Sequence, residues 1–225
     1  MKGEWSYLRL QLLPSQLRSE NQVAEQKRLA RTGNNLANVF ASLPRVHQSQ
    51  IAAQLCQLVP LYIDVDVRPR QHGHHRLVFQ DKWNKSVWYE PTQVSDGTMM
   101  LLAFLTLAHM QEPPDILAIE ELEYALHPHL LAEVVGMLRK LTTGEVGTKP
   151  VQVLLATHSA ELLNFVRPEE VRFLSRSLED GSTSVRKAPL DTEEWRAAYA
   201  EYEEALGELW LSGSLGGVPD TAAVQ

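Results

Sequence analysis

Two apolar runs that end in polar side chains dominate the hydrophobic pattern in the middle of the chain. Residues 116–119 lead directly into Glu120 and Glu121, and residues 151–156 lead into Thr157-His158-Ser159. Short unbroken apolar runs are typical of strands in a parallel sheet that is covered by helices. Such sheets bind ligands at the carboxyl ends of their strands, so the polar residues there are candidate site residues.

Apolar residues at helical spacing predict helices before and after these strands. Residues 99–110 are apolar nearly all round, which predicts a buried helix. Residues 128–142 carry one apolar stripe, with Pro128 suited to the first turn. Ser159 is placed to cap a short helix over 160–166. Together the order helix, strand, helix, strand, helix predicts the α/β class.

The flanking sequence predicts smaller elements. Residues 5–13 suggest a strand, and residues 15–33 suggest a connector with one helical turn. A helix is predicted over residues 36–43, with Asn34 or Asn35 as its cap, and a second helix over residues 47–59. Residues 61–67 alternate, with Leu61, Ile63, Val65 and Val67 on one side, and with 77–80 and 86–90 they predict a small antiparallel meander. The histidines of 72–75 fall in its turn, where a solvated loop is favoured over a metal site.

Towards the end of the chain, residues 171–174 and 182–185 predict edge strands. Asp191-x-x-Glu194 then suggests a capping box for a helix with Trp195, Tyr199, Tyr202 and Leu206 on one stripe, and after Trp210 the chain is expected to fray. These changes in pattern predict three parts: residues 1–92 with the first strand, helices and meander, residues 93–190 with the two polar-ended strands, and residues 191–225 with a helix and tail.

Composition narrows the function classes. The 225 residues carry a net charge of −7, which argues against a general polyanion binder. The single cysteine, Cys56, excludes an intramolecular disulfide, fits a reducing compartment, and lies in an apolar helical pattern that favours burial. No apolar run approaches the roughly 18 residues of a membrane span, so we expect no membrane association and a cytoplasmic location.

Each polar motif, taken alone, leaves a structural interpretation open. Ser95 fits a helix cap, His158 fits a satisfied histidine at a strand end, and the two glutamates fit the surface end of a strand. Their order is more specific. Ser95-Asp96-Gly97-Thr98, Glu120-Glu121, Leu126-His127-Pro128 and Thr157-His158-Ser159 follow one another at plausible spacing.

This ordered set resembles the C-terminal half of RecF/SMC-like, OLD-related predicted ATPases, which have an ABC-type ATPase head of the P-loop NTPase superfamily. The resemblance extends from Trp5 to Gly217 and includes Gly33-Asn34-Asn35-Leu36-Ala37 and the tail Leu206-Gly207-Glu208-Leu209-Trp210. It implies a partial P-loop NTPase fold, a three-layer sandwich with a small helical and antiparallel β subdomain.

The resemblance also implies roles. Glu120 corresponds to the Walker B acid that holds Mg²⁺, Glu121 to the general base that polarises the attacking water, and His158 to the switch histidine at the γ-phosphate of ATP. Ser95, Asp96, Gly97 and Thr98 correspond to the signature that meets the nucleotide of an opposing subunit in a head-to-tail dimer. Ala125, Leu126 and His127 correspond to an inter-subunit loop. Family roles in repair or defence further suggest DNA in the full assembly.

The sequence departs from the family in two places. Leu122-Glu123-Tyr124-Ala125 stands where relatives have proline followed by Glu-Asn-Gly, and no G-x-x-x-x-G-K-[ST] motif is present. We therefore expect the Walker A half to come from another segment or partner, and the chain alone to be weakly active. Two alternatives remain: a non-hydrolysing interaction module that completes a partner's ATPase site, and an unrelated α/β nuclease.

Overall fold

The computed structural model describes residues 5–177, 179–203 and 205–213. The chain divides between Thr157 and His158 into two units, residues 1–157 and 158–225, and each is described by itself. The three-part division expected from the sequence stays a prediction.

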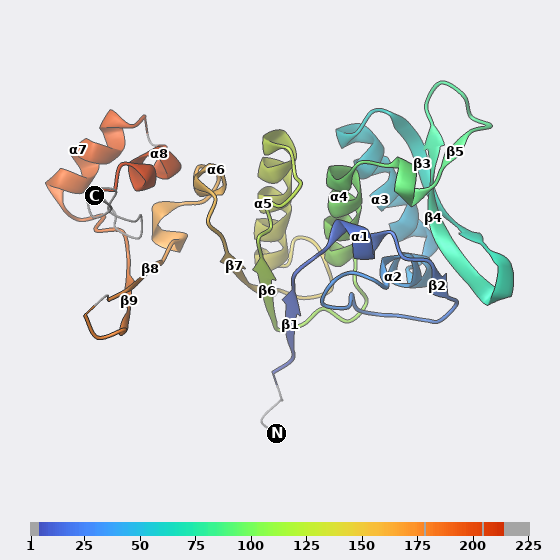
Figure 1. Cartoon of the computed structure of the whole chain (residues 1–225), viewed down its shortest axis with the longest axis horizontal. Helices are drawn as coiled ribbons and strands as arrows, with labels where there is room; N and C mark the ends of the chain where they lie inside the picture. Colours follow the sequence, from blue (N-terminus) through green and yellow to red (C-terminus); the bar gives the residue numbers. More distant parts are fainter. Residues whose placement is uncertain (1–4, 178, 204, 214–225) are drawn as a thin grey trace. The chain divides into compact units, whose positions relative to one another are not determined.

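The first unit contains a parallel sheet of three strands (Figure 1). Its order is β1 (Tyr7–Leu10), β6 (Ile116–Glu120) and β7 (Gln152–Ala156), with Ala118 opposite Arg9 on one side and Leu154 on the other. The middle strand buries Leu117 and Ile119 almost completely. The predicted α/β class, with parallel strands and helices, is confirmed.

One expectation about this sheet is wrong. Residues 151–156 were predicted to form a buried strand, but β7 alternates between exposed and half-exposed positions, and Leu154 is 52% exposed. The physical reason is that β7 is an edge strand, paired with β6 alone among the described strands.

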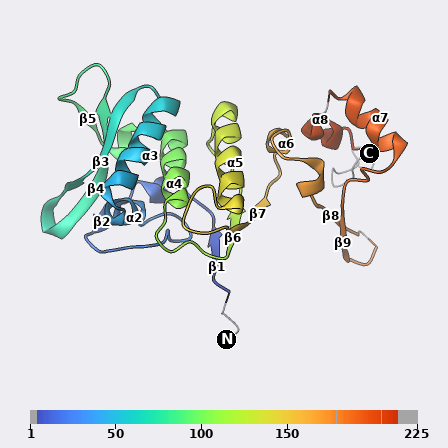
Figure 2. The ribbon, with the colours of Figure 1, turned by 180° about the vertical axis from the view of Figure 1, so that it is seen from behind.

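Two long helices, α4 (Asp96–Ala108) and α5 (Pro128–Thr143), lie side by side, and α5 packs against β7 (Figures 1 and 2). As predicted, α4 is buried at every position from Thr98 onward. The predicted stripe of α5 is also buried, and Pro128 occupies its first turn. Helix α5 ends at Gly144, whose left-handed φ of 77° suits a glycine cap.

The segment before the meander contains α1 (Pro14–Leu17), β2 (Asn21–Gln22), α2 (Leu36–Ser42) and α3 (Arg45–Leu58). Asn35 precedes α2 as predicted, but its side chain does not cap the helix. Its amide oxygen instead accepts the Ala30 N–H at 2.7 Å, and its amide nitrogen donates to the Arg28 carbonyl at 2.9 Å. Asn35 therefore holds the preceding loop, a long-range preference that a capping pattern does not reveal.

The meander is confirmed, with β3 (Tyr62–Pro69), β4 (His74–Asp81) and β5 (Trp88–Tyr89) antiparallel and β2 added at one edge. Two short 3-10 turns, Gln71–Gly73 and Pro91–Gln93, flank these strands. The expected alternation fails at its start, because the register shifts between Tyr62 and Asp64. As a result Ile63 is 39% exposed and Leu61 is 51% exposed.

His75 corrects a second expectation for the meander. It lies within β4 rather than in a solvated loop and is only 8% exposed. Its Nε2 is 2.5 Å from the Asn38 amide oxygen, and burial lowers the pKa of the imidazole. The histidine is thus a partnered core residue. Within the described ranges no group of three or more His, Cys, Asp or Glu side chains is arranged to hold a metal ion.

The second unit begins with α6 (Ala160–Leu163), a 3-10 turn at Pro168–Glu170, and the antiparallel pair β8 (Phe173–Arg176) and β9 (Thr183–Arg186). Ser159 caps α6 as predicted, by accepting the Leu162 N–H at 3.2 Å. The expected final helix is instead two, α7 (Glu193–Glu201) and α8 (Leu206–Leu211). Thr192, not Asp191, caps α7 by accepting the Trp195 N–H at 3.2 Å.

A close backbone contact joins α6 and α8. The Gly207 N–H donates to the Asn164 side chain at 2.8 Å, and a Cβ at position 207 would lie 1.9 Å from the Ala160 carbonyl oxygen. Only glycine fits there. The helix that follows His158 therefore packs against the Leu206-Gly207 tail segment, around a core of Leu163, Phe173, Trp195 and Leu209. Fraying was expected after Trp210; α8 continues to Leu211, and the chain beyond Gly213 lies outside the described residues.

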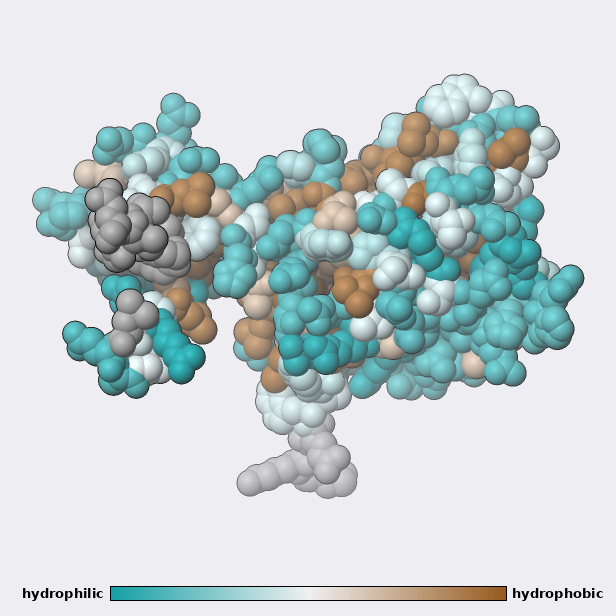
Figure 3. Space-filling model, viewed as in Figure 1, coloured by the Kyte–Doolittle hydropathy of each residue, from teal (hydrophilic) through white to brown (hydrophobic). Residues whose placement is uncertain are grey.

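On the face shown in Figure 3, hydrophilic side chains predominate and hydrophobic ones gather in a few patches. Among the described residues, no helix combines the length and apolar character that crossing a membrane requires. Cys56 is half-buried, as its pattern suggested, and burial, with a smaller effect of Asp64, raises the pKa of its thiol to about 11.

Candidate functional site

Glu120, the last residue of β6, is held by the neighbouring strand. Its Oε1 is 2.5 Å from Nε of Arg9 on β1, and this hydrogen bond is the main reason that the pKa of Glu120 lies below its ordinary value. The side chain is 28% exposed. Glu120 therefore carries a firmly ionised carboxylate at the carboxyl end of the sheet, already paired with one cation.

Glu121 leaves the strand with an unusual backbone. Its N–H donates to the Ala156 carbonyl at 3.0 Å, which extends the β6–β7 pairing by one bond. Its φ is +50°, in the left-handed region that non-glycine residues seldom occupy, and its side chain is exposed. The turn thus presents the second carboxylate to solvent at some cost in backbone strain.

The loop after the two acids is fixed by buried contacts. Leu122 is 1% exposed, and the Leu126 N–H donates to the Glu123 carbonyl at 3.1 Å. The Thr157 hydroxyl donates to Oε1 of Glu123 at 2.6 Å, whereas Oε2 of Glu123 is buried and has no hydrogen-bond partner among the described residues. Glu123 therefore connects the acidic turn to the end of β7, immediately before His158.

Ala125 has a φ of +61°. This is a left-handed conformation that glycine adopts freely and that other residues seldom occupy. Ala125 therefore bears backbone strain of about 1–2 kcal/mol.

Residues 95–98, which the resemblance predicts to be the signature and which we call the signature turn, open α4. Ser95 Oγ accepts the Thr98 N–H at 3.2 Å and lies 2.8 Å from the Thr98 hydroxyl. Asp96, in the first turn, pairs with Arg18 at 2.7 Å. A carboxylate in the first turn and a hydroxyl cap both stabilise a helix N-terminus.

The signature turn and the loop after the acids are in contact. A Cβ on Gly97 would lie 2.8 Å from the Ala125 carbonyl oxygen, so the two backbones approach as closely as only glycine permits. His127 is the N-cap of α5, and its Nδ1 accepts the His129 N–H at 3.3 Å. The fold thus places the N-termini of α4 and α5 beside each other.

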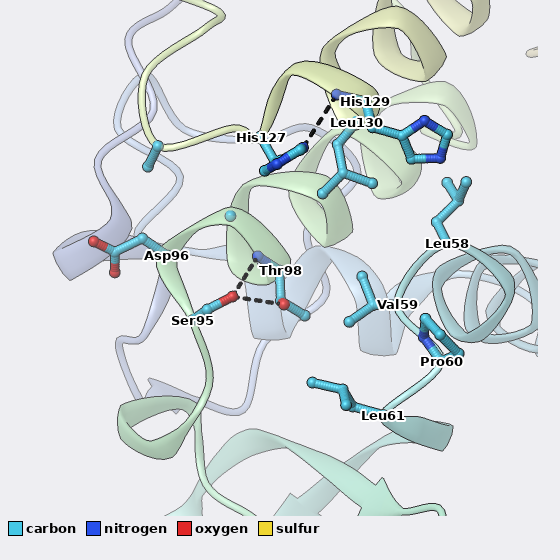
Figure 4. A pocket seen from close by; sticks show the side chains of 12 residues that line it. Leu58, Val59, Pro60, Leu61, Ser95, Asp96, Thr98, His127, His129 and Leu130 are labelled. Carbon is cyan, nitrogen blue, oxygen red and sulfur yellow. Dashed lines mark hydrogen bonds between the residues drawn. The ribbon is translucent and has the colours of Figure 1, made fainter.

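These two helix starts border a groove of about 550 Å³ (Figure 4). An apolar wall, Leu58-Val59-Pro60-Leu61, forms its other side, whereas Asp96 points away from that wall. The remaining lining residues are Ser95, Gly97, Thr98, Ala125, His127, His129 and Leu130. The groove therefore unites the predicted signature with two of the three predicted loop residues, whereas Glu120, Glu121 and Leu126 do not line it.

His158 is the first residue of the second unit and follows Thr157 directly. Its neighbour Ser159 caps α6, and α6 is anchored by the Gly207 contact. The sequence had singled out His158 and the Ser159 cap, but not the bond between Thr157 and Glu123 that precedes them.

The sequence did not predict a role at the site for three further residues: Arg9, Arg18 and Glu123. Each acts through a partner that is distant in the sequence, such as Glu120 for Arg9 or Asp96 for Arg18. Only the position of Arg9, on a strand that the sequence predicted, offered a signal in advance.

The donor set fits Mg²⁺ in a limited way. Mg²⁺ keeps several waters and takes one or two carboxylates together with substrate phosphates, so a cluster of three protein ligands is unnecessary. Glu120 offers a hard oxygen donor at the strand end, although Arg9 competes for one of its oxygens.

Solved structures of low sequence identity resemble the chain. One is described as "Structural biochemistry of ATP-driven dimerization and DNA stimulated activation of SMC ATPases", with 12% identity, a TM-score of 0.48, and coverage of 76% of this chain and 96% of that one. Another is an SmcHead bound to the C-winged helix domain of ScpA, with 13% identity, a TM-score of 0.47, and coverage of 65% and 43%. A third is an Smc head domain with a coiled coil and joint from Pyrococcus yayanosii, with 13% identity, a TM-score of 0.44, and coverage of 71% and 29%.

Comparison with curated proteins found no match. A sequence profile of one protein family, in contrast, matches residues 5–164, well over half of the chain. This range holds the signature turn, both acids, the loop after them and His158. The chain belongs to the family described as "AAA domain, putative AbiEii toxin, Type IV TA system".

Proposed function

We propose that this chain is the part of an ABC-type ATPase head that supplies the Walker B acids, the signature and the switch histidine. ATP binding and hydrolysis is the general activity to which an AAA domain points. The observation that carries the finer proposal is the contact of Gly97 with the Ala125 carbonyl. It joins two motifs, identified independently in the sequence, on one groove.

The signature turn is suited to phosphate. Ser95 offers a hydroxyl, α4 directs its free N–H groups and positive dipole end towards the turn, and α5 begins beside it. Because Nδ1 of His127 accepts a hydrogen bond, its neutral ring carries the proton on Nε2, which is a donor. In this proposal the groove receives the γ-phosphate of ATP that another subunit or segment holds.

The acids perform the reaction chemistry in this proposal. Glu120 would hold Mg²⁺, directly or through water, and a bound Mg²⁺ would supply positive charge against the phosphates. Glu121 is exposed and polarises the attacking water as general base. His158 donates to the γ-phosphate. Glu123 ties the loop after the acids to the end of β7, next to His158, through its hydrogen bond with Thr157.

The proposal includes a Walker A partner, in a head-to-tail homodimer or on another polypeptide. Two observations support it. The sequence contains no G-x-x-x-x-G-K-[ST] motif, and on the side away from β6 no described strand pairs with β7, where Leu154 is half-exposed. An open, apolar edge strand is a ready place for a further strand to pair.

A second candidate, a non-hydrolysing module that completes a partner's site, is favoured by one observation. The Arg9–Glu120 pair occupies the carboxylate that would hold the metal. If the pair persists in the assembly, the chain contributes Ser95 and Gly97 to a partner's site without hydrolysing ATP at its own acids.

The test measures ATP binding and turnover by the purified chain, alone and with the polypeptide that carries the Walker A loop. We expect little turnover alone, turnover on mixing, and loss of turnover with retained binding in Glu121→Gln. Robust hydrolysis by the chain alone would refute the dependence on a partner. Turnover that depends on Ser95 but is unchanged in Glu121→Gln would support the non-hydrolysing module instead.

A further inference from the structure

The side chain of Arg18 contacts the chain on both sides of Ser95. Arg18 is the C-cap of α1, and only 17% of its side chain is exposed. Nη1 donates to the Pro14 carbonyl of its own helix at 2.9 Å. Nε donates to the Pro91 carbonyl at 2.9 Å, and Nη2 donates to the Val94 carbonyl at 2.7 Å.

The same Nη2 lies 2.7 Å from Oδ1 of Asp96, whose own side chain is 54% exposed. One guanidinium therefore binds the chain on both sides of Ser95, at Val94 and at Asp96. The planar fork of arginine has five N–H donors in fixed directions, and this geometry allows it to satisfy several carbonyl groups at once.

These contacts have an electrostatic consequence. Asp96 stabilises the start of α4, but its negative charge sits next to the place where a phosphate would approach. Arg18 compensates this charge by pairing with Asp96, whose side chain points away from the apolar wall of the groove (Figure 4). The turn then keeps its acidic helix start without repelling an anion.

We infer that Arg18 is a positioning residue for the signature: it fixes the turn that carries Ser95 and Gly97 and neutralises Asp96, so that the helix start can receive a phosphate. The phosphate part of this inference rests on the proposed function, whereas the fixing of the turn does not. Lysine cannot replace Arg18, because a single ammonium nitrogen cannot span three carbonyls and a carboxylate.

The first measurement is amide hydrogen exchange of the full chain in Arg18→Met and Arg18→Lys. We expect the Thr98 and Met99 amides, which bond to Ser95, to exchange at least about tenfold faster in both variants. Amides of β6 should be unchanged. The matched control is Arg45→Met, which removes an arginine that is 84% exposed and should alter neither region.

The second measurement is ATP turnover with the Walker A polypeptide. Arg18→Lys should lower kcat about tenfold and leave KM for ATP nearly unchanged. Asp96→Asn should restore part of the activity of Arg18→Met, because it removes the uncompensated charge. A purely structural role for Arg18 would not predict this rescue.

Unchanged amide exchange at Thr98, or acceleration that is equal in β6, would overturn the inference. If the wild-type chain shows no ATP turnover in any mixture, the proposed function fails, and the exchange result still decides whether Arg18 fixes the turn.

Discussion

The two ends of the parallel sheet are built differently. At the amino end of β6, the Asp115 carboxylate accepts hydrogen bonds from the Ser6 N–H at 2.7 Å, from the Ser6 hydroxyl at 3.0 Å and from Lys149 at 2.5 Å. These bonds, the one from Lys149 above all, lower its pKa to about 2. At the carboxyl end, Glu121 and Ala125 have positive φ values, and one oxygen of Glu123 is buried without a partner among the described residues.

The difference separates stability from function within one sheet. The amino end satisfies its polar groups and holds the sheet together. The carboxyl end keeps strained backbone at Glu121 and Ala125, and among the described residues one oxygen of Glu123 has no partner. Such costly features persist only where the surrounding structure enforces them, and they cluster at functional sites. Four substitutions test this division, from the largest expected effect to the smallest.

Glu121→Gln should have the largest effect, because it should lower activity at the carboxyl end of the sheet without changing the stability of the fold. Removal of a general base should lower ATP turnover in the complete assembly about 10²–10⁴-fold, while the melting temperature stays close to that of the wild type. The control Glu133→Gln, an exposed position on α5, should alter neither quantity. Equal turnover in the two variants would remove Glu121 from the reaction.

Gly97→Ala should damage the carboxyl end sterically. The new Cβ would lie 2.8 Å from the Ala125 carbonyl oxygen, so the loop must move, at a cost of about 1–3 kcal/mol. Urea denaturation measures the change in the free energy of unfolding. Gly136→Ala provides the matched control, since nothing lies within 4 Å of its added Cβ, and it should stabilise α5 by about 1 kcal/mol. Equal stabilisation by both substitutions would show that the signature turn and the loop are not in contact.

Asp115→Asn should weaken the amino end in a pH-dependent manner. The folded pKa of about 2 lies below the ordinary 3.8, so the carboxylate contributes stability above the unfolded pKa and loses it as the pH falls towards 2. The difference in melting temperature between wild type and variant should therefore be largest above about pH 4 and shrink towards about pH 2. A difference that is constant with pH would contradict the role of the charged carboxylate.

Ala125→Gly should give a small gain. Glycine adopts a φ of +61° without strain, which favours the folded state. Glycine also gives the unfolded chain more conformational entropy, which offsets part of this gain. We therefore expect the free energy of unfolding to rise by about 0.5–1 kcal/mol. The control Ala132→Gly, inside α5, should destabilise by about 1 kcal/mol. The opposite signs can be read from chemical denaturation, and a loss of stability in both variants would argue against strain at Ala125.

The sequence predicted the elements whose signals are local. The apolar runs before Glu120 and Thr157, the buried helix after Ser95 and the stripe that follows Pro128 all lie where periodicity and capping placed them. These signals depend on neighbours within one or two helical turns, so they survive without knowledge of the fold.

Features that depend on distant neighbours could not be predicted in this way. The exposure of β7 follows from its place at the sheet edge, and the outward position of Ile63 follows from a register shift. At the site, Arg18 meets Asp96, and Thr157 meets Glu123, only after folding. The sequence therefore named the residues with reactive groups but not those that hold them.

Cys56 has a practical consequence for studying this ATPase domain. Maleimide reagents react with thiolates, and a thiol whose pKa is about 11 carries almost none near neutral pH. As the only cysteine of the sequence, it leaves a silent background for site-directed labelling. A cysteine introduced at the exposed Trp83 and another on α7 would each accept a dye. Energy transfer between the two dyes would then show whether the distance between them changes when ATP is added.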